Sequence, residues 1–204
     1  MFEPSAVPSA RGIPVIVGTN RGEHARYATS HPKFNKPFSE EDLRADLAPD
    51  FKDPGVDALI AAYRQSRPKA TPWELMIGIR SNRFHVSAVR LAERQAQVAP
   101  VYQYSFDFAP SSLGAAHAAE IAFVFSNATA NANARPGAKA VEDAMSEAWL
   151  AFARTGNPNH PGMPPWPTYD TATRAVMVFN AITAVVNDPR SSERRVWEGK
   201  APVR

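Results

Sequence analysis

The sequence predicts an α/β fold in which helices flank an incomplete, mostly parallel sheet. A strand pattern is followed by several helical patterns, a second strand, a long helix and two short strands. Hydrophobic residues make up 44% and charged residues 21% of the 204 residues, close to the averages of globular domains. This length suits one domain. Four strands are few for a sheet that must be buried on both faces, so we expect one edge to lack its partners.

The first strand and the first two helices are indicated by local patterns. Residues 13–17 form a short apolar run, and the polar residues 18–20 after it are expected to turn. Ser39, followed by three acidic residues and two leucines at helical spacing, predicts a capped helix that Pro49 ends. Apolar spacing predicts a second amphipathic helix over residues 57–65.

The middle of the chain predicts two consecutive helices and a strand. Thr71 and Glu74 form a capping-box pattern, with a proline at the first helical position. A further helical pattern, interrupted near residues 78–83, ends at Pro100. Residues 101–108 then alternate large apolar with polar side chains, as a strand does.

The last third predicts a long helix and two strands. Residues 136–154 carry one apolar face, and Gly156 stands where a helix C-cap is expected. Residues 175–180 and 182–187 have strand length and composition. The alternation of alanine, threonine and asparagine over residues 128–134 is interpreted as a loop.

Composition excludes several classes of function. Without cysteine there is no disulfide framework, thiolate zinc site or cysteine nucleophile. No apolar run approaches the ~18 residues that a membrane span requires, so no membrane association is expected. The acid and proline in residues 1–4 do not form an export signal, and the compartment stays open.

Charge and histidine spacing argue against nucleic acid and metal. The net charge is only +3, and we interpret Arg190, Arg194 and Arg195 as a solvated face rather than a nucleic-acid patch. No two histidines have the H-x-x-x-H spacing of a helical metal site. The four considered for such a site are His24, His31, His85 and His160. We therefore expect no metal and no cofactor.

Glu23 and His117 are the candidate catalytic residues. Glu23 follows the first strand, where α/β proteins bind ligands, although a solvated loop glutamate would look the same. His117 follows the second strand among small residues that leave its ring accessible for proton transfer. A structural histidine is the alternative. An acid and then a histidine, here 94 residues apart, is the order found in α/β-hydrolase triads.

Four segments in register resemble the type B carboxylesterases. They are residues 13–23 (IPVIVGTNRGE), 114–125 (GAAHAAEIAFVF), 152–159 (FARTGNPN) and 166–170 (WPTYD). The resemblance covers nearly the whole chain and matches the C-terminal portion of that family. It implies the C-terminal part of an α/β-hydrolase fold and hydrolysis of small-molecule carboxylic esters by a serine, glutamate and histidine triad. By this resemblance Glu23 is the triad acid and His117 the triad base.

The chain also departs from the family pattern. Gly22 replaces the usual aspartate, Ala118 the glycine after the histidine, and Ser126 a common glycine. No G-x-S-x-G and no glycine-rich oxyanion segment occurs, and only 22 residues precede Glu23. We therefore expect residues 1–204 to be a single C-terminal segment of a carboxylesterase domain. It would lack the nucleophile-bearing part and be inactive alone.

Neither the serines nor the aromatic residues offer a complete substitute site. Ser111 and Ser112 lie near His117 in sequence but in a proline-flanked loop, so we interpret them as plain loop residues. Clustered aromatic side chains could line an ester pocket but are more often core. They are Tyr102, Tyr104, Phe123 and Phe125. The alternative function is a non-catalytic binding or interaction module, or one half of a split esterase whose partner donates the serine.

Overall fold

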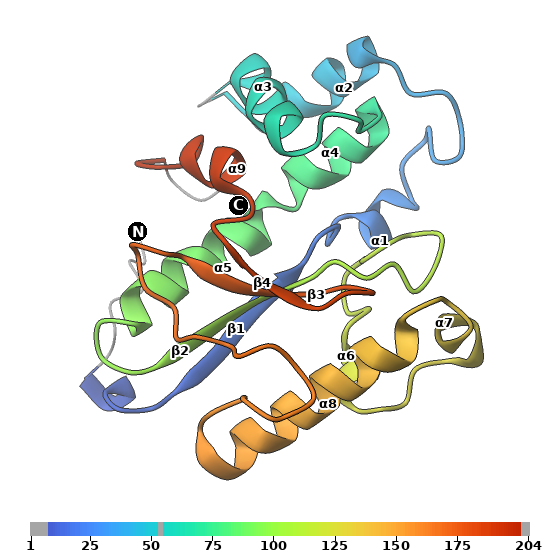
Figure 1. Ribbon diagram of the computed structural model, residues 1–204. Helices are drawn as coiled ribbons and strands as arrows, with labels where there is room; N and C mark the ends of the chain where they lie inside the picture. Colours follow the sequence, from blue (N-terminus) through green and yellow to red (C-terminus); the bar gives the residue numbers. More distant parts are fainter. Residues whose placement is uncertain (1–7, 53–54, 201–204) are drawn as a thin grey trace.

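The computed structural model describes residues 8–52 and 55–200 (Figure 1). Its elements, in chain order, are η1 (Pro8–Ala10), β1 (Val15–Asn20), α1 (Ala25–Ala28), α2 (Glu40–Leu47), α3 (Val56–Ser66), α4 (Pro72–Arg80), α5 (Asn82–Gln95), β2 (Val101–Phe106), α6 (Ile121–Val124), α7 (Ala130–Asn133), α8 (Ala138–Thr155), β3 (Ala175–Phe179), β4 (Ala184–Asn187) and α9 (Ser191–Arg195).

A four-stranded sheet forms the centre of the molecule, in the order β1-β2-β3-β4. β1, β2 and β3 are parallel, and β4 returns antiparallel to β3. The register runs from Val15 opposite Val101 to Asn20 opposite Phe106. The predicted α/β class and mostly parallel sheet are confirmed. Within the described residues, β1 pairs on one side only, so its outer edge is free.

Helices cover both faces of the sheet because successive strand residues point to opposite sides. Tyr102 and Phe106 pack into a cluster with α6 and α8, whereas Val101 packs with Ala92 of α5. Figure 1 accordingly shows α5 and α8 on opposite sides of the strands. Gly156 ends α8 in the left-handed conformation, with φ of 74°, as its sequence position predicts.

The helices α2, α3, α4 and α9 form a second layer beyond the carboxyl ends of the strands (Figure 1). Their shared core includes Leu43, Leu47, Leu59, Tyr63, Leu75, Ile79 and Trp197. Both predicted caps are present. Ser39 accepts the Asp42 amide at the start of α2, and Thr71 accepts the Glu74 amide at the start of α4. The predicted interruption near residues 78–83 is the junction of α4 and α5.

Two local predictions are wrong. Residues 18–20 are strand rather than turn, since the β1–β2 register continues to Asn20 and the turn begins at Arg21. Residues 128–134 are not all loop, because Thr129 accepts the Ala132 amide and caps the short helix α7. Pairing with β2 decides the first case, and the hydrogen bond from the Ala132 amide to Thr129 decides the second.

The predicted solvated face of arginines is also wrong. Arg190 is buried, and its guanidinium donates to the hydroxyls of Thr19 and Ser105 at the ends of β1 and β2. Arg194 is largely buried against Asp188. Only Arg195 of the three is exposed. Arg190 thus links the start of α9 to the sheet, and the three arginines do not form a basic surface.

None of the helices built by residues 8–52 and 55–200 has both the length and the apolar character needed to cross a bilayer.

Candidate functional site

Glu23 and His117 meet at the carboxyl end of the sheet. Glu23 lies in the turn after β1, and His117 lies in the loop after β2. Because β1 and β2 are adjacent and parallel, these two connections leave the same edge of the sheet. His117 Nδ1 lies 2.7 Å from Glu23 Oε2. The residues singled out from the sequence therefore form a hydrogen-bonded pair.

The turn that carries Glu23 is fixed by main-chain bonds. The Asn20 amide donates to Glu23 Oε1 at 2.7 Å, so each carboxylate oxygen has its own donor. The amides of Arg21 and Gly22 donate to the carbonyls of Phe106 and Ala115 at 2.9 and 3.0 Å. Glu23 is only 5% exposed. The carboxylate is thus held in a single orientation toward the histidine.

The loop that carries His117 makes a tight turn directly after it. Ala118 has φ of 65°, a left-handed conformation that costs a residue with a Cβ roughly 1–2 kcal/mol. Glycine adopts it freely, which explains why glycine suits this position in the pattern that the chain resembles. The Ala119 amide donates to the Ala116 carbonyl at 3.0 Å across this turn. The turn projects the imidazole toward the acid.

The imidazole of His117 stands between two aromatic rings. The Tyr27 and Phe84 ring centroids lie 5.6 and 5.2 Å from its own. The Arg83 guanidinium covers both of those rings, at 5.4 and 4.9 Å. The side chain of His117 is still 40% exposed, and Nε2 makes no hydrogen bond to the part of the chain that the structure describes.

This geometry defines what the pair can do chemically. A carboxylate only accepts hydrogen bonds, so Nδ1 carries the proton and Nε2 is left as the basic nitrogen. An imidazole held in this tautomer can remove a proton from a hydroxyl, and the carboxylate stabilises the imidazolium that results.

A cavity of about 930 Å³ opens beside the same turns. Gly22 and Ala115 line it, and Phe34, Trp73 and Ile77 contribute apolar side chains to its wall. Neither Glu23 nor His117 lines it. The cavity therefore adjoins the pair through the main chain only.

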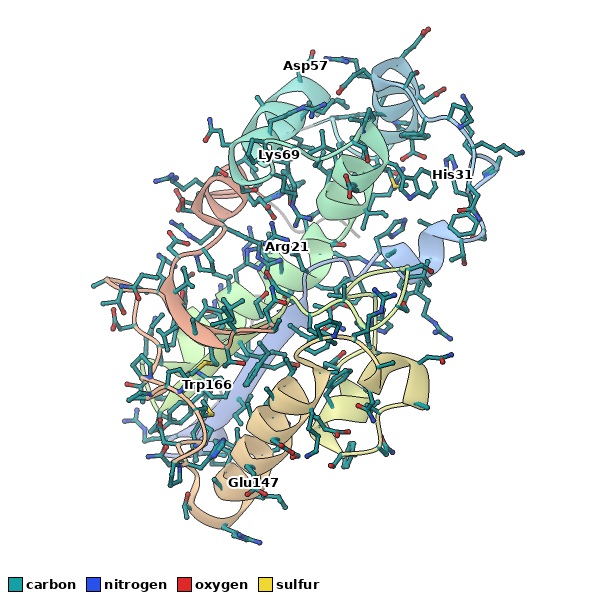
Figure 2. The ribbon with its side chains drawn as sticks, turned by 45° about the vertical axis from the view of Figure 1, so that its right-hand side comes forward. Arg21, His31, Asp57, Lys69, Glu147 and Trp166 are labelled. Carbon is teal, nitrogen blue, oxygen red and sulfur yellow. The ribbon has the colours of Figure 1, made fainter. Side chains whose placement is uncertain are left out.

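The cavity is charged where the sheet meets the helical layer. Arg21 lies at that junction and pairs with Asp107 at 3.1 Å, and Lys69 lies between α3 and α4 (Figure 2). Arg67 also lines the cavity, but its guanidinium is bound to buried Glu193.

Comparison with known proteins identifies the family. Residues 4–197 match the model of the carboxylesterase family. The chain belongs to the carboxylesterase family. It is 31% identical over 195 residues to the para-nitrobenzyl esterase of Bacillus subtilis, covering 92% of this chain and 38% of that protein. It is 27% identical over 179 residues to the phenmedipham hydrolase of Pseudarthrobacter oxydans, covering 81% of this chain and 35% of that one.

Solved structures agree. A carboxylesterase of Geobacillus stearothermophilus superposes with a TM-score of 0.75 at 33% identity, covering 90% of this chain and 40% of that one. The α/β-hydrolase fold and the resemblance drawn from the sequence are thereby confirmed. This carboxylesterase-family chain spans about two fifths of the length of the relatives that it matches.

Of the other candidates from the sequence, Ser112 lines the cavity, and the others do not join this site. Ser111 accepts the Leu113 amide within its loop. Tyr102 and Phe123 belong to the core and Tyr104 packs against it, whereas Phe125 is 71% exposed. None of these four aromatic residues lines the cavity. Among the described residues, no three histidines, aspartates or glutamates gather as metal ligands.

Sequence reasoning missed several residues of the site in this carboxylesterase-family chain. Asn20 was assigned to a turn, although a buried polar residue at a strand's carboxyl end is itself a signal of a site. Tyr27 comes from α1 and Phe84 from α5, and no sequence pattern pairs them with His117.

Proposed function

We propose that this chain supplies the acid, Glu23, and the base, His117, of a serine triad that hydrolyses carboxylic esters. In this proposal residues 1–204 are a single C-terminal segment of a carboxylesterase domain. The nucleophilic serine comes from a polypeptide segment outside these residues, since no G-x-S-x-G occurs in them. The chain alone is then inactive.

The observation that carries the proposal is the 2.7 Å contact between His117 Nδ1 and Glu23 Oε2, with Nε2 left without a partner among the described residues. In the proposed reaction Nε2 takes the serine proton as the hydroxyl attacks the ester carbonyl. His117 then returns the proton to the departing alcohol, and the ionised Glu23 stabilises the imidazolium between these steps. Water completes the cycle by the same route and releases the carboxylic acid.

The surface around the pair supports a further segment packing here. Ile121, the first residue of α6, and Phe125, the residue that caps its C-terminus, are 49% and 71% exposed. Exposed apolar side chains of this size mark surfaces that another element covers. The free edge of β1 is the second such surface, because a parallel strand normally has neighbours on both sides.

The order of the strands favours one edge of the sheet for the segment that would carry the serine. β2, which leads to His117, already has β1 and β3 as neighbours, and the far edge of the sheet is the antiparallel β4. A parallel strand that ends near Glu23 and His117 can add only beside β1. We therefore assign the serine-bearing strand to that edge.

The first test is to sequence about a kilobase of DNA upstream of the Met1 codon and search for an in-frame G-x-S-x-G. Where it is found, the extended protein is assayed with short p-nitrophenyl esters. Glu23→Gln should lower kcat roughly 10⁴-fold and His117→Gln roughly 10⁶-fold. His160→Gln is the matched control, because the side-chain bonds of His160 to the described residues go to the Ala144 carbonyl and the Gly162 amide, away from Glu23 and His117. Unchanged rates in both triad variants would refute the assigned roles.

The isolated chain gives an independent test. It should neither hydrolyse these esters nor be labelled by a fluorophosphonate, which modifies activated serines. Enzyme-like turnover together with labelling of one of its fourteen serines would refute a serine from elsewhere. If an unrelated gene lies upstream, size-exclusion chromatography and thermal melting separate the alternatives. A compact monomer that melts cooperatively favours an independent binding module, whereas aggregates favour one half of a split esterase.

A further inference from the structure

We infer that Asn20 is a positioning residue that ties the turn carrying Glu23 to the loop carrying His117, so that the two triad groups stay in register. The inference rests on the proposed function, since positioning matters only if the pair is catalytic. Asn20 is the last residue of β1 and is 1% exposed.

Asn20 contacts both halves of the pair. Its main-chain amide donates to Glu23 Oε1 at 2.7 Å. Its side-chain Nδ2 donates to the carbonyl of Ala116 at 2.7 Å, one residue before His117. Nδ2 also donates to Glu120 Oε2, three residues after it. One residue therefore holds the acid and both flanks of the histidine.

The chemistry of the position calls for an amide. The Ala116 carbonyl oxygen and Glu120 Oε2 are both acceptors, so the side chain between them must carry two N–H groups. The same requirement decides that the NH₂ group of the Asn20 amide, and not its oxygen, faces these two acceptors. An aspartate would point lone pairs at two acceptors. An alanine would leave the buried Ala116 carbonyl without this donor.

The unpaired oxygen of the Asn20 side chain indicates that this residue does more than fill space. Asn20 Oδ1 is buried and has no partner in the described residues. A buried polar atom without a partner destabilises the fold, so a position that only filled space would suit an apolar residue better. The two bonds made by Nδ2 offset this cost.

Glu120 adds an electrostatic reason for the tether. Burial raises the pKa of its carboxyl group, the nearby charge of Glu23 raises it further, and the hydrogen bond from Asn20 opposes both effects. Through its main chain and its side chain, Asn20 donates to both carboxylates beside His117. It thus keeps Glu120 directed away from the imidazole and leaves Glu23 as the partner of Nδ1.

The test reads the tautomer of His117 from the ¹⁵N shifts of Nδ1 and Nε2 in long-range ¹H–¹⁵N spectra, at a pH where the imidazole is neutral. In the wild-type chain Nδ1 should carry the proton, and Glu23→Gln should weaken this preference. Asn20→Ala should lose it as well, with Nε2 becoming protonated in a large fraction of molecules. His117→Gln assigns the signals among the five histidines.

Asn159→Ala is the matched control. Asn159 Nδ2 donates to the Trp166 carbonyl and its Oδ1 accepts the Trp166 amide, so this variant also breaks a pair of side-chain hydrogen bonds that hold a loop together. Because this loop follows the C-terminal end of α8 and makes no bond to the Glu23 turn or the His117 loop among the described residues, the His117 tautomer should not change. If Asn159→Ala shifts the tautomer as much as Asn20→Ala does, the effect is general destabilisation and the inference fails.

The outcomes separate the inference from the proposed function. A wild-type tautomer with the proton on Nε2 would count against the triad pair itself. A wild-type Nδ1 proton that persists in folded Asn20→Ala would overturn only the role of Asn20. If Asn20→Ala does not fold, Glu120→Ala decides, since it removes one end of the tether at a less buried site. An unchanged tautomer in that variant overturns the inference, and a partial shift supports it.

Discussion

Replacing Glu193 by glutamine should strongly destabilise the chain. Glu193 is 2% exposed, and Arg67 Nε donates to its Oε1 at 2.9 Å while Nη2 reaches its Oε2 at 3.3 Å. Arg67 is itself largely buried and also donates to the Arg21 carbonyl beside the Glu23 turn. The substitution would leave this guanidinium buried without a counter-ion, which typically costs roughly 3–5 kcal/mol.

The low pKa of Glu193 leads to a destabilisation of similar size. Burial raises the pKa of its carboxyl group, but the charge and hydrogen bond of Arg67 outweigh burial and hold the pKa at about 2. A depressed pKa stabilises the fold above the unfolded value of about 4.5, and this contribution is lost as the pH falls toward about 2. The shift corresponds to about 3 kcal/mol at neutral pH.

Urea unfolding measures the effect directly. With a slope near ~2 kcal/mol/M, Glu193→Gln should lower the midpoint by about 1.5 M at pH 7. The difference from wild type should shrink between pH 4.5 and 2, since the wild-type carboxylate is then protonated too. Glu198→Gln is the control, because the Glu198 side chain is 59% exposed and Arg194 keeps Asp188 as its partner, so the substitution should cost less than ~1 kcal/mol. A midpoint shift that equals this control, or one that does not depend on pH, would refute the reasoning.

Three further results are expected. Ala118→Gly should raise the melting temperature by roughly 1–3 °C, because it relieves a φ of 65° at a small entropic cost; a lower melting temperature would contradict this. Gly18→Ala should destabilise by about 1–3 kcal/mol in urea, since a Cβ there would lie 2.3 Å from the Tyr104 ring, and a neutral result would mean that the ring moves freely. His24 should titrate near pH 4 by NMR, because burial and then the charge of Arg80 lower the pKa of its imidazole to about 4, and a midpoint near 6.5 would show it solvated.

Structure determined by neighbouring residues was predictable from the sequence. The caps at Ser39, Thr71 and Gly156 need only bonds within a few residues, and all three are observed where the pattern indicated. Arg190 is the opposite case. Its guanidinium donates to the hydroxyls of Thr19 and Ser105, which lie 171 and 85 residues away in the sequence. No local pattern around Arg190 indicates these partners.

The pairing of Glu23 with His117 was predictable although five helices separate them, because it depends on topology rather than on distance along the chain. Adjacent parallel strands present their following loops at one edge, so an acid after β1 and a histidine after β2 are brought together by the pairing of those strands. Asn20 escaped prediction because it was assigned to a turn. Residues 18–20 extend β1 by pairing with Tyr104 to Phe106. Asn20 is then the last residue of the strand, and its side chain reaches the loop that carries His117.

The same topology explains why Glu23 and His117 are so well ordered. Within residues 8–52 and 55–200, the hydrogen bonds that orient this pair and the turns that carry it come largely from β1, β2 and the two connections after these strands, and Arg67 adds one to the Arg21 carbonyl. In the proposed triad a serine-bearing segment would contribute none of these bonds, so acid and base would be positioned before the nucleophile joins them. Such a segment, added beside β1, would have to place a hydroxyl within reach of Nε2 and also supply the oxyanion donors, because no glycine-rich oxyanion segment occurs in residues 1–204. The acid–base half of the proposed triad would then be a preorganised unit, completed from the free edge of β1.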